Sequence, residues 1–173
     1  MEGSKYRMEM VNVYNKILVG VDGSEHGAKA LREAVKLAQA FKAELHVFHA
    51  IRHHYYMPMF PLGFNLPYPA VTFSDQITEE KMQKMYEESG MQIIEQAKQQ
   101  VEAMKIPLEC KVVYNLEMVL TPVDFVKSYV KDNGIGLVIV GCEGHHSRAR
   151  TAITGTVAMD IVNSAPCPVL VVR

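Results

Sequence analysis

A glycine-rich segment near the end of the chain has the residue types of an anion site. The segment follows the apolar run Leu137 to Val140 and leads into an amphipathic stretch, and its key residues are Gly141, Gly144, Gly155 and Thr156. In a turn that joins a buried strand to a helix, backbone N–H groups point outward and the helix dipole favours negative charge. Glycines let a phosphate approach the main chain, and a threonine hydroxyl can bond its oxygens. We therefore expect a nucleotide phosphate as the first candidate ligand.

Residues that would make this segment catalytic are missing from the sequence. No Lys-Ser/Thr ending follows the glycines, so the lysine that a P-loop places on the γ-phosphate is absent. The chain also has no G-x-S-x-G elbow and no H-E-x-x-H pair. We expect no dedicated enzyme, with slow ATP hydrolysis through a bound Mg²⁺ and one oriented water as the alternative.

Apolar runs and amphipathic segments alternate along the chain, and they must position the glycine-rich segment. Runs of strand length occur at Lys16–Asp22, Glu44–Ile51, Leu108–Tyr114, Gly136–Val140 and Val169–Val172. Helical spacing of apolar residues is found from Ser24 to Phe41, from Asp75 to about Met104, from Thr121 to Asn133, and in a segment with Ile153, Val157 and Ile161. The pattern predicts an α/β fold with a parallel sheet covered by helices on both faces.

Three of these expected strands end at residues that could meet a ligand. In parallel sheets ligands bind beyond the carboxyl ends of the strands, where the winding direction reverses. Asp22, Ala50 with Ile51, and Gly141 all fall at such ends. Asp22 could instead cap the helix that follows, and Ser24 is also suited to that role. Both roles are compatible with one carboxylate.

Composition indicates one globular domain without a general affinity for polyanions. The chain has 173 residues, 49% hydrophobic and 21% charged, with a net charge of -1. That charge offers no general attraction to nucleic acid or to an anionic membrane. Its three cysteines lie far apart and form no CxxC, which favours a reducing cytoplasm. The charge-free stretch Tyr55 to Phe73 carries four prolines, so we expect a loop (55–75) rather than a membrane helix.

Three segments together resemble the universal stress protein family. They are Val19-Gly-Val-Asp-Gly-Ser24, the glycine-rich segment from Gly141 to Thr156, and the ending Asn163 to Arg173. The resemblance covers Lys16 to Arg173 and leaves residues 1–15 as an N-terminal extension. It implies a single five-stranded α/β domain with strand order 3-2-1-4-5.

ATP-binding members of that family carry Gly, two residues, Gly, nine residues, then Gly with Ser or Thr. The resemblance implies that Asp22 meets the ribose or adenine and that the main chain at Ala50 meets the adenine edge, with Val21 and Ile51 beside them. The ribose and phosphates would be held by Gly141, Gly144, Gly155, Thr156 and the Val157 amide. Here ten residues, not nine, separate Gly144 from Gly155.

Further polar side chains flank the same expected edge. Arg148 and Arg150 could neutralise β- and γ-phosphates, or they could be solvated surface charges. The pairs His53-His54 and His145-His146 could bind a metal or sense pH, but no carboxylate or cysteine spacing supports a metal site. Solvated loop histidines are the simpler interpretation.

The resemblance implies an ATP-binding regulatory or stress-response protein, with or without Mg²⁺, in which nucleotide occupancy changes conformation or partner choice. It also implies a homodimer joined through Val169–Val172. The alternatives are an interaction module that dimerises and binds no nucleotide, and an ATP-cleaving enzyme on a related fold.

Overall fold

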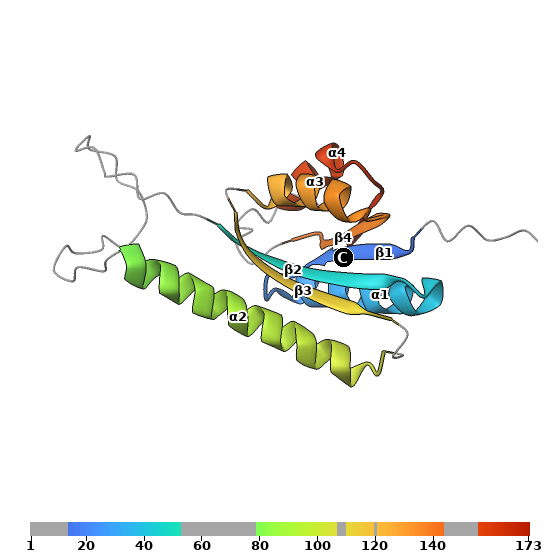
Figure 1. Cartoon of the computed structure of the whole chain (residues 1–173), viewed down its shortest axis with the longest axis horizontal. Helices are drawn as coiled ribbons and strands as arrows, with labels where there is room; N and C mark the ends of the chain where they lie inside the picture. Colours follow the sequence, from blue (N-terminus) through green and yellow to red (C-terminus); the bar gives the residue numbers. More distant parts are fainter. Residues whose placement is uncertain (1–13, 53–78, 107–109, 120, 144–155) are drawn as a thin grey trace, which may run out of the picture.

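The computed structural model describes residues 14–52, 79–106, 110–119, 121–143 and 156–173 (Figure 1). Of the expected N-terminal extension only residues 14 and 15 are described, and the loop 55–75 lies outside the described ranges. Residues 144–155 lie outside them as well, including Gly144, Gly155, Arg148 and Arg150. Both histidine pairs fall on undescribed residues too.

Five parallel strands form one sheet in the order β3-β2-β1-β4-β5. The strands are β1 (Lys16–Gly20), β2 (Glu44–Arg52), β3 (Val112–Val119), β4 (Leu137–Gly141) and β5 (Val169–Val172). The predicted fold class and the strand order implied by the resemblance are confirmed.

Helices cover both faces of this sheet, which buries its central strands (Figure 1). One face carries α1 (Glu25–Phe41) and α2 (Glu79–Ala103), and the other carries α3 (Pro122–Asn133) and α4 (Thr156–Ser164). Side chains alternate along β1, with Ile17 and Val19 in the α1 and α2 core and Leu18 in the core of α3 and α4. Burial on both faces explains why the central strands read as continuous apolar runs.

Capping side chains begin two of the helices. The Ser24 Oγ accepts a hydrogen bond of 2.9 Å from the Gly27 N–H at the start of α1. The Thr121 Oγ1 accepts one of 3.1 Å from the Asp124 N–H at the start of α3. At the other end of α3, Gly134 adopts a left-handed conformation with φ 65°. These contacts satisfy backbone groups that a helix end otherwise leaves unpaired.

The third strand differs from its prediction. It runs from Val112 to Val119, whereas the apolar pattern predicts Leu108 to Tyr114, of which residues 107–109 are not described. Asn115 and Glu117 interrupt the apolar pattern, so periodicity alone ends the strand too early. Pairing overrides the pattern, because β2 is long enough to partner every residue from Val112 to Val119. Other strand ends shift by one or two residues, as for β1, which ends at Gly20.

A polar network fixes α3 against β2 and β3. His46 is only 3% exposed, and its Nδ1 lies 2.8 Å from the Tyr129 hydroxyl. That hydroxyl accepts a hydrogen bond of 3.0 Å from Asn115 Nδ2. On its other side, the His46 Nε2 lies 3.3 Å from Glu44 Oε1, within ion-pair range although without hydrogen-bond alignment. Glu44 is in turn paired with Lys111 at 2.9 Å.

Candidate functional site

The candidate site lies at the carboxyl ends of three neighbouring strands. Because β1 lies between β2 and β4, their parallel directions bring these ends to one edge of the sheet. Val21 and Asp22 follow β1, Ala50 and Ile51 lie near the end of β2, and Gly141 ends β4. The winding direction reverses beside β1, which is the usual ligand position in sheets of this kind.

Asp22 braces the turn between β1 and α1. Its Oδ1 accepts hydrogen bonds from the Ser24 backbone N–H at 3.0 Å and from the Ser24 Oγ at 2.6 Å. Ser24 rather than Asp22 caps α1, so Asp22 holds the cap residue in place. The packing here is close, because a Cβ on Gly27 would lie 2.6 Å from Asp22 Oδ1. The carboxylate is therefore positioned by a dense hydrogen-bonded turn.

The β1–β2 ladder ends beside this turn. Its last backbone bond runs from the Val21 N–H to the Phe48 carbonyl at 2.9 Å. The Val21 carbonyl lies 2.8 Å from the Nδ1 of His49. No backbone bond within the described ranges continues the ladder from Val21 to Ala50. The main chain of Ala50 therefore lies just past the last rung, at the edge where a ligand could meet it.

Gly141 is required by packing on α1. A Cβ at this position would lie 2.7 Å from the His26 carbonyl carbon and 2.9 Å from the His26 Cβ. The backbone of β4 can approach the first turn of α1 only because the side chain is absent. Beside it, Cys142 is 4% exposed, so its thiol is packed in the protein interior.

Two predicted site residues bury their side chains in the core. Ile51 is 6% exposed, and a Cβ on Gly90 of α2 would lie 2.9 Å from its Cδ1. Val21 is 7% exposed and packs in the core beneath α1. At most their main chains can face a ligand at the edge of the sheet.

The start of α4 contributes the remaining described part of the site. Thr156 is its first residue, although its side chain is not described. Val157 is half-buried against the core of α3 and α4. The helix places its N-terminal amides after the glycine-rich segment, which is the arrangement expected for phosphate.

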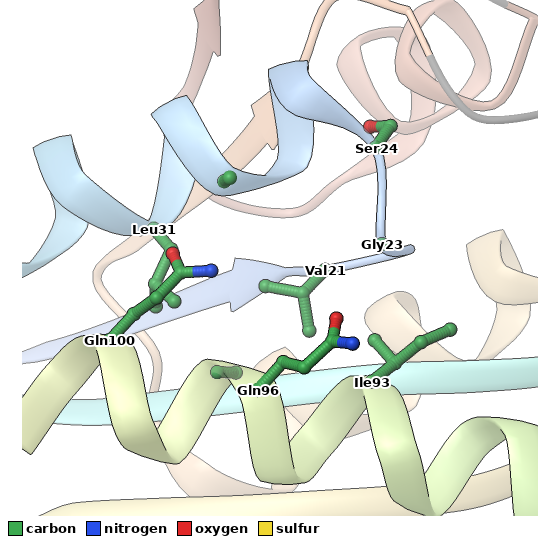
Figure 2. A pocket seen from close by; sticks show the side chains of 9 residues that line it. Val21, Gly23, Ser24, Leu31, Ile93, Gln96 and Gln100 are labelled. Carbon is green, nitrogen blue, oxygen red and sulfur yellow. The ribbon is translucent and has the colours of Figure 1, made fainter.

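A small pocket lies on the α1 and α2 side of the same turn (Figure 2). Its volume is about 40 Å³, with Val21, Gly23 and Ser24 on one side and Ile93, Gln96 and Gln100 among its other lining residues. The two glutamine side chains extend from α2 toward α1 and the end of β1 (Figure 2). The pocket has room for a few water molecules, at ~10–15 Å³ each, and not for a nucleotide.

Within the described ranges, no group of three His, Cys, Asp or Glu side chains is arranged to hold a metal ion. Among the described helices, none combines the length and the apolar character needed to cross a membrane.

Two histidines of β2, His46 and His49, were not predicted to make specific contacts. His46 contacts the Tyr129 hydroxyl, and His49 contacts the Val21 carbonyl. Their place among the apolar residues of a strand expected to be buried was the available signal.

Comparison with known proteins places these features in a family. The chain matches the model of the Universal stress protein family over residues 13–173. It is 32% identical over 162 residues to universal stress protein YxiE of Bacillus subtilis (strain 168), an alignment covering 93% of the chain and 100% of the relative.

Solved structures show the same fold. Universal stress protein UspA from Lactobacillus plantarum superposes with a TM-score of 0.73 at 22% identity, covering 92% of this chain and 98% of that chain. A universal stress protein in complex with cAMP gives a TM-score of 0.60 at 20% identity, covering 92% and 97%. Since the family match spans nearly all of the sequence and the sheet has the order the resemblance implied, the chain belongs to the universal stress protein family.

Proposed function

We propose that the chain binds an adenine nucleotide across the carboxyl ends of β1, β2 and β4, and that ATP is its ligand. Occupancy of the site would change conformation or partner choice in a stress-response pathway. Family membership supports this proposal, as does the related protein of the same fold that binds cAMP.

The observation that carries the proposal is the open end of the β1–β2 ladder beside Asp22. Adenine presents a ring nitrogen that accepts a hydrogen bond next to an amino group that donates one. A main-chain N–H and C=O, such as those of Ala50 beyond the last β1–β2 rung, match that pattern. An adenine base would therefore extend the ladder where β1 no longer does.

Asp22 is the proposed contact to the ribose. A carboxylate offers about four acceptor positions, so its bonds to Ser24 are compatible with a ribose hydroxyl. Because Ser24 and the first turn of α1 hold the carboxylate in place, little conformational entropy is lost when it binds.

The phosphates would lie between Gly141 and the start of α4. Backbone amides from the proposed Gly144, Gly155, Thr156 and Val157 positions would carry them, and Mg²⁺ would accompany them as a counterion. The residues of the chain would then bind and orient the nucleotide. Hydrolysis would be slow, because the sequence has no P-loop lysine.

Isothermal titration with ATP tests this site. Asp22→Asn keeps an oxygen that can accept from Ser24 but removes the charge, and we expect affinity to fall roughly tenfold, the effect of one charge-assisted hydrogen bond. Asp132→Asn, at an exposed position of α3, is the matched control and should bind like the wild type. Equal ATP affinity in the wild type and Asp22→Asn would remove Asp22 from the site.

We further propose a homodimer through β5. This strand is at the edge of the sheet and pairs only with β4 among the described strands. Leu170 on this strand is an exposed apolar side chain, and so are Met159 and Val162 on α4, which contacts β5. An unpaired edge with apolar neighbours is a favourable surface for a second copy.

A cytoplasmic location is part of the same proposal. All three cysteines are free thiols, with Cys110 and Cys142 buried. A protein that keeps its cysteines unpaired suits a reducing compartment.

A further inference from the structure

His49 occupies the position where the β1–β2 ladder ends. Its Nδ1 lies 2.8 Å from the carbonyl oxygen of Val21. A carbonyl oxygen can only accept a hydrogen bond, so the Nδ1 must carry the proton and donate it. The imidazole is thereby held in one orientation, between the end of β1 and the strand that carries it.

This bond replaces a rung of the ladder. In the parallel pair, the Val21 N–H bonds the carbonyl of Phe48, so the Val21 carbonyl would next accept from the N–H of Ala50. The imidazole of His49 takes that acceptor instead. Within the described residues, no backbone bond then joins Ala50 to β1.

The same bond also fixes the start of the turn that carries Asp22. The Val21 carbonyl and the Asp22 N–H belong to one planar peptide unit, so holding the oxygen sets the plane from which Asp22 departs. Ser24 restrains the carboxylate of Asp22 from the other side. His49 therefore adjoins both proposed contacts: it precedes Ala50 in the chain, and it bonds the peptide unit that leads into Asp22.

We propose that His49 is a positioning residue for the nucleotide site, an inference that rests on the proposed function. By occupying the Val21 carbonyl, it keeps the Ala50 N–H available to the adenine base and holds Asp22 toward the ribose. A nucleotide then binds to an edge that is already open, rather than breaking a backbone bond first.

Two substitutions separate positioning from simple stability. His49→Asn places an amide Nδ2 as many bonds from the backbone as the imidazole Nδ1, so it can still donate to Val21. His49→Leu has similar bulk and no donor, which frees the carbonyl for Ala50. We expect ATP to bind roughly tenfold more weakly to His49→Leu, while His49→Asn stays within about threefold of the wild type, since one hydrogen bond changes affinity by about a factor of ten.

The outcomes distinguish this inference from the proposed function. A wild type that binds no adenine nucleotide overturns both. A wild type that binds ATP, with His49→Leu binding equally tightly, overturns only the role of His49. If His49→Leu does not fold, a long-range ¹H–¹⁵N spectrum of the wild-type imidazole decides the matter: a proton on Nδ1 supports the bond, and one on Nε2 alone contradicts it.

Discussion

At the scale of single residues, two positions at the sheet edge have structural roles of their own. Asp22 braces the cap residue of α1, and Gly141 makes room for the backbone of His26. Both positions were expected to serve a ligand. Their structural roles are compatible with that proposal, but they also explain why Asp and Gly stand there without any ligand.

Gly141→Ala should destabilise the fold. The added Cβ would lie 2.7 Å from backbone of α1, which cannot move as a side-chain end can. We expect the free energy of unfolding to fall by about 1–3 kcal/mol, the usual cost of overpacking. Urea denaturation measures it, with Gly134→Asn as the control, because nothing lies within 4 Å of a Cβ there and Asn tolerates the left-handed conformation. An unchanged midpoint for Gly141→Ala would contradict the packing account.

His46 should make stability depend on pH. Burial lowers the pKa of His46, with Lys16 and Lys111 acting in the same direction and Glu44 opposing them. The unfolded chain, with an ordinary histidine pKa of 6.5, therefore binds a proton more readily than the folded one. The free energy of unfolding is therefore not reduced by His46 above pH 6.5. It decreases as the pH falls below 6.5, toward the lower pKa that His46 has in the folded protein.

Urea denaturation between pH 8 and pH 5 tests this dependence. His46→Gln should lose less stability than the wild type over that range, because nothing titrates at this position. Tyr129→Phe removes the hydroxyl that contacts Nδ1 but keeps the imidazole, so it should lose about 1 kcal/mol and retain the pH dependence. Parallel pH profiles for His46→Gln and the wild type would show that His46 is not responsible.

At the scale of elements, apolar strands and capped helices were predictable, because local residue types decide them. β5 has the predicted bounds, and Ser24 caps α1 as the sequence indicates. α3 is capped by Thr121, the first residue of the predicted helical segment. β3 was misplaced because its partner β2, rather than its own polar residues, determines its length. The contact of His49 with Val21 was not predictable either, since it depends on where the β1–β2 ladder ends.

Ser24→Ala and Thr121→Ala form a matched pair of cap deletions. Each removes a side chain that accepts from the first turn of a helix, so each should cost about 1 kcal/mol of stability. Ser24 also holds Asp22, whereas Thr121 starts α3. We therefore expect only Ser24→Ala to weaken ATP binding in a titration. Equal weakening by both would indicate a general loss of stability instead of a local effect on the site.

At the scale of the whole molecule, the exposed edge of β5 predicts the oligomeric state. Leu170→Glu places a charge on an exposed apolar position of that edge and should convert a dimer into a monomer by light scattering after size exclusion. Met85→Glu, on an exposed apolar position of α2, is the control and should leave the mass unchanged. A wild type that is monomeric at all concentrations tested would contradict the proposed dimer.

The central claim is that the carboxyl ends of β1, β2 and β4 form an adenine-nucleotide site. The most direct measurement purifies the protein without added nucleotide, denatures it, and identifies the released small molecules by chromatography and mass spectrometry, with a thermal shift on ATP addition recorded in parallel. We expect ATP or AMP in the supernatant, or a rise in melting temperature with ATP. An empty protein whose melting temperature does not respond to ATP would contradict the account.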